Sequence, residues 1–170
     1  MKKYLALLAI LVVGFTACQP ETDSRKDVPE TITADVPDGI PMDELAYKQE
    51  SSRDFDELVA AVEASAAERK FTVLAKHDVH QTLTSKGMEI PRYTIIEVCN
   101  GKYAHSILSE NMDVGMFLPC RIAVYEGEST NTLVMMRPTL IRTMMPDQDF
   151  GSIPEDVEAT LIEVMTEAAG

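Results

Sequence analysis

The sequence predicts an α+β fold, with a mainly antiparallel sheet packed by helices. Three observations support this prediction. Two segments, around 52–63 and 152–168, repeat apolar residues at the helical period, and several shorter segments have the composition and alternation of strands. One pair of strands flanks a turn-forming cluster that fits a hairpin. Residues 47–170, about 124 in all, suit one domain with its own core.

The first predicted helix follows Ser52, a residue type that caps helices. Acidic residues interrupt its apolar positions, as expected for a helix with one buried face. These apolar positions are Phe55, Leu58, Val59 and Val62.

Two strands are predicted next, over Phe71–Lys76 and Tyr93–Cys99. In the second strand, the alternation places Ile96 and Val98 on one face of the sheet. Residues Val79–Lys86 between the strands predict a short helix that ends at Gly87.

Residues Gly101–Asn111 predict a helix. The strands Arg121–Glu126 and Thr132–Arg137 flank the turn cluster 127–130. A closing helix is predicted from the capping box Ser152–Glu155. Its apolar stripe consists of Val157, Leu161, Val164, Met165 and Ala168.

The N-terminus has the pattern of a cleaved secretory leader. Lys2 and Lys3 precede an apolar run, Leu5–Phe15, which as a helix would span only about 16 Å of a roughly 30 Å hydrocarbon core. Thr16-Ala17-Cys18 resembles the lipobox that lipoprotein signal peptidase reads. The resemblance implies a signal peptide over residues 1–17 and lipid attachment, including palmitate-type acyl chains, at Cys18. An ordinary secretory leader is the alternative.

Residues 18–46 have the composition of an acidic, proline-containing tether. The formal charge of the whole chain is −13, so its surface would repel nucleic acid and anionic headgroups, and membrane contact is expected through the lipid alone. We therefore expect a location in the cell envelope. An aspartate after the lipidated cysteine favours retention in the inner membrane of enteric bacteria, but here Gln19 follows Cys18. For a Gram-negative host we therefore prefer the outer membrane, on its periplasmic side.

Five ordered blocks resemble the domain of unknown function 302 family. They are Phe71–Asp78, Cys99-Asn100, Phe117–Arg121, Val124–Glu126 and Met136–Pro138, and the resemblance covers nearly all of residues 50–170. It implies a TATA-binding-protein-like α+β fold and a homodimer, and it implies no established activity.

Histidine and carboxylate side chains suggest a metal or haem site. His77, Asp78 and His80 lie together at a predicted strand end, and His105 offers a further imidazole. Neutral imidazoles with a carboxylate suit zinc, copper or haem iron. The alternative is that His77 and Asp78 cap a turn and that His80 is simply exposed.

The two cysteines of the domain allow two further interpretations. Cys120 follows Pro119, which could present its thiol at the mouth of a cleft, although a reactive thiolate needs a cation such as Arg121 or His77 beside it. Buried, inert cysteine is the commoner case. A Cys99–Cys120 disulfide is the second interpretation, because both residues lie at strand ends in an oxidising compartment.

Three other polar residues of the matched blocks are candidate ligand-binding residues. Asn100 is either such a residue or a helix cap. Tyr125 and Glu126 either line a pocket with the imidazoles or serve as a core residue and a solvated charge.

Three functions remain open. The first, which we favour, is a lipid-anchored accessory module that binds a small ligand or cofactor near His77 and Cys120. The second is a thiol- or metal-dependent enzyme that uses the same residues. The third is a dimerising domain without chemistry, in which the matched residues only pack and turn the chain.

Overall fold

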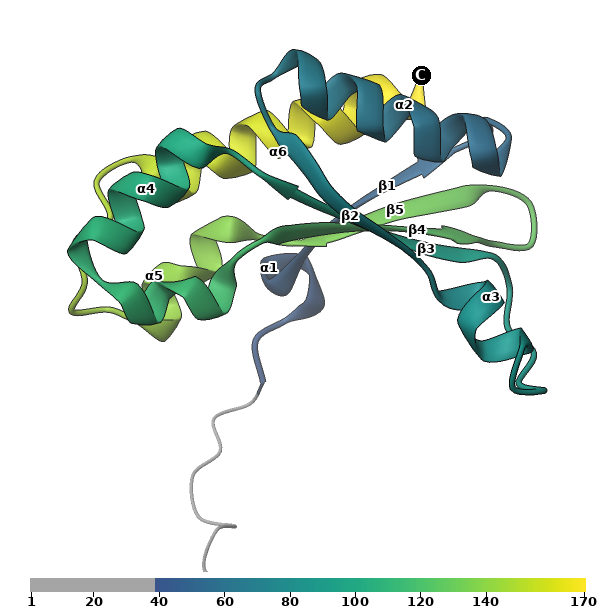
Figure 1. Ribbon diagram of the computed structural model, residues 1–170, viewed down its shortest axis with the longest axis horizontal. Coiled ribbons are helices and arrows are strands. Elements are labelled where there is room, and N and C mark those ends of the chain that lie inside the picture. The colour runs from purple at the N-terminus through teal and green to yellow at the C-terminus, as the bar shows by residue number, and fades with distance from the viewer. Residues whose placement is uncertain (1–38) are drawn as a thin grey trace, which may run out of the picture. The chain divides into compact units, whose positions relative to one another are not determined.

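The computed structural model describes residues 39–170, and within that range the core of the fold is one antiparallel sheet (Figure 1). The sheet has the order β1-β5-β4-β3-β2, and every neighbouring pair is antiparallel. Its strands are β1 (Ala46–Ser51), β2 (Thr72–Asp78), β3 (Tyr93–Cys99), β4 (Cys120–Glu126) and β5 (Asn131–Met136). This confirms the predicted α+β class and antiparallel sheet.

Two long helices cover one face of the sheet, α2 (Phe55–Glu68) and α6 (Ile153–Ala169) (Figure 1). Ile96 and Val98 of β3 point into this covered face and are fully buried, as their alternation predicts. The main hydrophobic core lies between the sheet and the two helices, and it includes Leu58, Leu161 and Met165. We call the opposite face, which α2 and α6 do not cover, the open face.

The helix caps differ in part from those predicted. Asp54, not Ser52, caps α2, and its carboxylate accepts the N–H groups of Asp56 and Glu57. The capping box of α6 does not form, because the Ser152 hydroxyl donates to Asp156 and Glu155 is paired with Arg142. Both helices still begin within a few residues of the predicted positions, because the apolar stripe fixes which residues are buried.

Residues 42–46 were assigned to the tether, but they form α1 (Met42–Leu45) and begin β1. The edge strand β1 was not predicted, because its sequence AYKQES is polar and lacks β-branched residues. The backbone N–H of Arg137 donates to Leu45, which holds α1 against the end of β5. The leader, Cys18 and the rest of the tether lie outside the described residues. No helix within residues 39–170 is long and apolar enough to cross a membrane.

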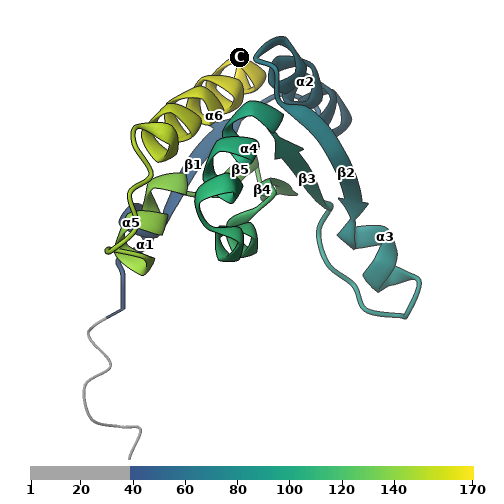
Figure 2. The same cartoon turned by 60° about the vertical axis from the view of Figure 1, so that its left-hand side comes forward.

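The two ends of the sheet carry different connections (Figure 2). At one end lie the β4–β5 turn and α3 (Val79–Thr84), which leads through a loop into β3. We call this the α3 end. At the other end, which we call the cavity end, lie four further helical segments. They are α4 (Gly101–Glu110), the 3-10 helices η3 (Met112–Phe117) and η4 (Pro138–Leu140), and α5 (Ile141–Met144).

The edge strand β2 contains an irregularity. Val73 pairs with Val98 and Ala75 pairs with Glu97, so Leu74 is an extra residue in a β-bulge. Leu74 is largely exposed, and the next position on the covered face, Lys76, is paired with Glu63 of α2 at 3.1 Å.

Candidate functional site

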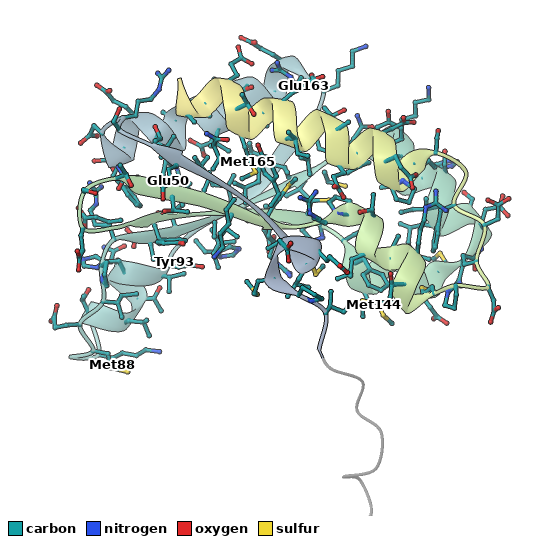
Figure 3. The ribbon with its side chains drawn as sticks, turned by 180° about the vertical axis from the view of Figure 1, so that it is seen from behind. Glu50, Met88, Tyr93, Met144, Glu163 and Met165 are labelled. Carbon is teal, nitrogen blue, oxygen red and sulfur yellow. The ribbon has the colours of Figure 1, made fainter. Side chains whose placement is uncertain are left out.

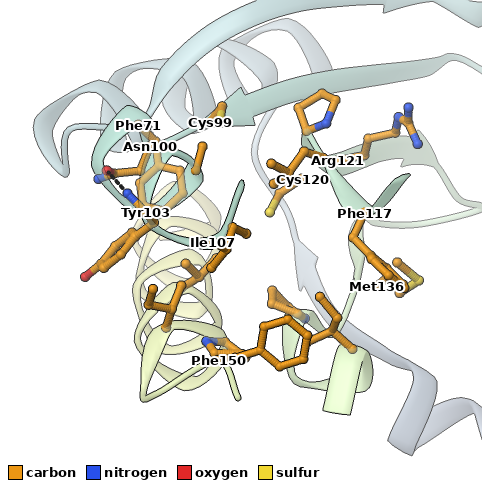
Figure 4. Close-up of a pocket in the computed structure, with 18 of the residues that line it drawn as sticks. Phe71, Cys99, Asn100, Tyr103, Ile107, Phe117, Cys120, Arg121, Met136 and Phe150 are labelled. Carbon is orange, nitrogen blue, oxygen red and sulfur yellow. Dashed lines mark hydrogen bonds between the residues drawn. The ribbon is translucent and has the colours of Figure 1, made fainter. Parts of the chain in front are cut away.

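An apolar cavity of about 260 Å³ opens at the cavity end of the sheet (Figure 4). Its walls come from the end of β3, α4, η3, the start of β4, the end of β5, η4, α5 and the start of α6. The side chains that define its shape are Tyr103, Ile107, Phe117, Met136, Phe150 and Val157.

The cavity exists because two apolar clusters do not merge. The main core ends at Phe71 and Val157, while a smaller cluster of Val114, Ile141 and Phe150 packs between η3, α5 and the loop before α6. Residues from both clusters line the cavity. Protein interiors are normally close-packed, so a space of this size between two apolar clusters is a candidate ligand-binding site.

Cys120 contributes the most buried titratable group of the cavity. Its Sγ points into the space (Figure 4), because the register places Cys120 opposite Val98 on the covered face. Burial, together with the neighbouring charge of a Cys99 thiolate, raises the pKa of Cys120 from 9.0 to about 11. The thiol is therefore protonated at neutral pH, the opposite of what an activated nucleophile requires.

Asn100 also borders the cavity, but its side chain is engaged as a helix cap. Its Oδ1 accepts the backbone N–H of Lys102 at 3.0 Å and that of Tyr103 at 3.4 Å. The capping role that its sequence position suggested is therefore confirmed.

Within residues 39–170, the only charged side chains along the cavity wall are two arginines, Arg121 and Arg137. The guanidinium of Arg121 turns away from the space (Figure 4), and its Nε donates to Glu97 on the open face at 3.2 Å. Arg137 Nε donates to the carbonyl of Asp43 at 3.0 Å, and another of its nitrogens is paired with Glu158.

Glu158 anchors the wall behind the cavity. Its carboxylate accepts from Arg137 and from both the backbone N–H and the hydroxyl of Thr139. Burial opposes the charge, but the hydrogen bonds from Thr139 and Arg137 outweigh burial and hold the pKa of Glu158 below its ordinary value. This network ties α6 to the end of β5 and fixes the position of Val157, one residue earlier in α6.

The predicted histidine site lies at the other end of the sheet and does not border the cavity. His77 lies in β2 and pairs with Ile95 of β3. Asp78 ends β2 and caps α3, because its carboxylate accepts the backbone N–H of Gln81 at 2.7 Å. Nδ1 of His80 lies 2.8 Å from the carbonyl oxygen of Ile90. Asp78 is thus a cap, as the simpler interpretation held.

No metal-binding cluster of three or more His, Cys, Asp or Glu side chains occurs within residues 39–170. His77 Nε2 lies 3.5 Å from Glu97 Oε1, an oxygen that also accepts from Arg121. His105 is an exposed residue of α4, and β3 separates that helix from the α3 end. The predicted His77–His80 metal site is therefore not assembled in the described part of the chain.

The Cys99–Cys120 disulfide is absent, and both side chains are free thiols. Cys99 pairs with Thr72, whereas Cys120 pairs with Val98, the residue before Cys99. Because neighbouring residues of a strand point to opposite faces, the two thiols leave the sheet on opposite sides. The sequence prediction placed both residues at the same end of the sheet, which is correct, but it did not fix the register.

Tyr125 and Glu126 lie at the α3 end as well. The ring of Tyr125 stacks on that of Tyr93, with centroids 5.8 Å apart and an interplanar angle of 9°, on the open face. Glu126 is exposed beside the hairpin turn, where its carboxylate accepts the backbone N–H of Arg92 at 3.4 Å. Neither residue borders the cavity.

The candidate residues therefore separate into two groups. Cys99, Asn100 and Cys120 border the cavity, while His77, Asp78, His80, Tyr125 and Glu126 lie at the α3 end. Sequence reasoning missed the residues that shape the cavity most, such as Tyr103, Ile107 and Phe150. Their only signal was apolar character in a segment expected to be helix or loop, which also fits ordinary core residues.

The fold and the cavity define a single-domain α+β protein with a five-stranded antiparallel sheet and an apolar pocket at one end. The model of the family described as "Domain of unknown function DUF302" matches residues 47–168, and the chain belongs to this family. The crystal structure of an uncharacterized conserved protein DUF302 from Bacillus stearothermophilus is similar, with 32% sequence identity and a TM-score of 0.69. The similarity covers 73% of this chain and 98% of that one. A search of curated proteins finds no match.

Proposed function

We propose that the domain is a binding module for a small, largely apolar molecule held in the cavity at the end of the sheet. The observation that supports this proposal is the cavity itself, about 260 Å³ between two separate apolar clusters. Ligand sites are typically concave and mostly apolar with few polar groups, and this wall follows that pattern.

The size of the cavity limits the ligand. One water molecule takes up about 30 Å³ in the liquid, so 260 Å³ corresponds to about nine units of that size. A single ring or a short unbranched chain fits this space, whereas a haem macrocycle is too large. No histidine lines the described wall, so the histidine ligation that we considered for haem iron is missing as well.

Binding explains the polar groups of the wall better than catalysis does. The thiol-enzyme alternative requires a depressed pKa, but burial raises the pKa of Cys120 to about 11. His77, the imidazole proposed to assist it, lies at the other end of the sheet. A neutral thiol in an apolar wall is a packing surface for a ligand.

The test is native mass spectrometry of the chain from Gln19 onward, which keeps the whole compact unit 39–170 and is purified from its own host. Ala104 faces the cavity from α4, so Ala104→Trp should fill the space and remove any co-purifying mass. His105→Trp adds the same side chain at an exposed position outside the cavity and should keep that mass. Titration with octanoate should likewise give binding that Ala104→Trp abolishes.

Loss of the adduct in both tryptophan variants would point to a general folding defect, which circular dichroism would reveal. A folded wild type without any adduct and without octanoate binding would contradict the proposal. In that case the third function, a domain without chemistry, becomes the working one.

We also propose that the module is a lipoprotein of the cell envelope, anchored at Cys18 with its first 17 residues removed. The leader-like N-terminus and the lipobox resemblance support this proposal. Metabolic labelling with palmitate should mark the wild type and leave Cys18→Ser unlabelled. Fractionation of a Gram-negative host should recover the labelled protein with the outer membrane, and recovery of an unlabelled, fully soluble wild type would contradict the anchor.

A homodimer is a further proposal, and it rests on the family resemblance. The open face offers a surface for it, because Ile95 and Val134 sit there beside the stacked Tyr93 and Tyr125 without a covering helix. Light scattering at micromolar concentration should give twice the monomer mass. Ile95→Lys should restore the monomer if this face is the interface.

A further inference from the structure

We infer that the cavity takes up the end of one acyl chain of a membrane lipid, and that its mouth faces the membrane that holds the anchor. This inference rests on the proposed binding function and names its ligand class. It is carried by the position of the exposed methionines, by the place where the chain joins the domain, and by the charges of the cavity wall.

Two exposed methionines lie at the mouth of the cavity. Met116 of η3 and Met136 of β5 both line the cavity, yet 72% and 50% of their surface is exposed. Met112, near the start of η3, and Met144, at the end of α5, are also exposed. Exposed apolar groups gathered around one opening mark an interaction surface, and unbranched thioether side chains adapt well to flexible apolar partners.

The N-terminal segment joins the domain beside this mouth. The carbonyl of Asp43 in α1 accepts from Arg137, and Ala46 pairs with Met136, so two residues of the cavity wall contact the first described segment directly. Ile40 and Met42 in that segment are exposed as well. Roughly 20 residues separate Cys18 from Gly39, and a chain of that length reaches at most about 70 Å. An anchor at Cys18 therefore brings the mouth of the cavity within reach of the bilayer.

The chemistry of the wall suits one lipid chain. The interior is lined mainly by apolar side chains and holds about 260 Å³, which suits the end of one hydrocarbon chain. Within residues 39–170 the only charged residues of the wall are Arg121 and Arg137, and their guanidinium groups are paired with Glu97 and Glu158. Neither charge is left to hold a headgroup inside the cavity, so the headgroup stays outside while the chain enters.

The α3 end provides an internal control for this inference. Met88 is also exposed, at 46%, and lies at the tip of the loop after α3, whereas Met144 lies at the other side of the domain, on α5 (Figure 3). A methionine exposed only by chance would contact lipid as often at position 88 as at position 116.

The experiment places the photoreactive residue p-benzoylphenylalanine at Met116 in one full-length variant and at Met88 in another. Each lipidated protein is irradiated in vesicles of phosphatidylethanolamine and phosphatidylglycerol that contain a radiolabelled phospholipid, and adducts are identified by mass spectrometry. We expect phospholipid adducts at position 116 at least tenfold above those at position 88. Adding Ala104→Trp to the Met116 variant should reduce its adducts at least fivefold.

Three results would overturn the inference. They are no adduct at position 116, equal adducts at both positions, and an adduct at position 116 that Ala104→Trp leaves unchanged, since that last result would indicate surface contact alone. Octanoate titration of the chain from Gln19 onward separates the two proposals. If octanoate binds but phospholipid does not cross-link, the binding function stands and only the membrane-lipid ligand fails.

Discussion

The two ends of the sheet are built from the same strands but differ in almost every physical property. The cavity end is apolar and enclosed by α4, η3, α5 and α6, with a neutral thiol inside. The α3 end is polar and exposed, and α3 has no buried residue. His77 lies toward it, with its Nε2 3.5 Å from Glu97 Oε1 on the open face.

This difference shows why the matched sequence blocks do not form one site. A block that spans a whole strand places its first and last residues at opposite ends of the sheet, so Phe71 lines the cavity whereas Asp78 caps α3. Cys120 begins β4 at the cavity end, whereas Tyr125, five residues later, lies near the α3 end. At about 3.3 Å per residue the two are separated by roughly 16 Å along the strand. The cavity end is therefore the binding site we propose, and the α3 end is ordinary surface.

The largest difference between the two ends is expected in the free energy of unfolding that is lost when a carboxylate is removed. Glu158→Ala leaves Arg137 partly buried without its partner, and we expect a loss of roughly 2–4 kcal/mol in the free energy of unfolding. Glu126→Ala, its control at the α3 end, should cost less than about 0.5 kcal/mol. Urea unfolding of both variants measures this, and equal losses would contradict the contrast.

The same carboxylate predicts a pH dependence. Because the pKa of Glu158 is lower in the folded state, its stabilisation is present above the ordinary value of 4.5 and is lost as the pH falls through the folded-state pKa. Wild type should therefore lose more stability than Glu158→Gln as the pH falls below about 4.5. Parallel curves for the two proteins would mean that the charge of Glu158 contributes nothing.

The second contrast concerns the thiols. A rise of the Cys120 pKa from 9.0 to about 11 lowers its thiolate fraction at pH 8 about 100-fold. In the chain from Gln19 onward, iodoacetamide should alkylate Cys120 in Cys99→Ser at least tenfold more slowly than Cys99 in Cys120→Ser. In 8 M urea the two rates should become equal. Rapid alkylation of Cys120 in the folded protein would support the thiol-enzyme alternative.

A smaller effect is expected at the two helix caps. Asn100→Ala removes the cap of α4, which borders the cavity, and should cost about 1 kcal/mol of global stability. Asp78→Ala removes the cap of α3, a helix without buried residues, so we expect local fraying with little change in global unfolding. Hydrogen exchange read by mass spectrometry distinguishes local from global opening. A global loss in Asp78→Ala would show that α3 is an integral part of the core.

The smallest effect is expected for His77→Ala. Its contact with Glu97 is an exposed polar contact at 3.5 Å, so the free energy of unfolding should change by less than about 0.5 kcal/mol. The mass bound in native mass spectrometry should also stay the same. Loss of that mass in His77→Ala would show that His77 contributes to ligand binding, and would contradict the separation of the two ends.

Periodic segments were predictable from the sequence, and spatial relations between segments were not. The helical stripe of Phe55–Val62 and the alternation of Tyr93–Cys99 placed α2 and β3 correctly, because one buried face leaves a regular pattern. β1 was missed because an edge strand with polar residues has no such pattern. Register decides whether Cys99 and Cys120 share a face, and a shift of one residue reverses the answer. The cavity depends on residues from eight separate helices and strands, so no local sequence pattern predicts it.

The bulge at Leu74 has a consequence for the behaviour of many copies crowded together. A regular edge strand exposes a row of unpaired N–H and C=O groups that another chain can extend into a continuous sheet. In β2 the extra residue breaks the spacing of that row, and the charged Lys76 follows it on the covered face. Chains that are held side by side at high local density are thereby less prone to join through this edge into fibrillar aggregates.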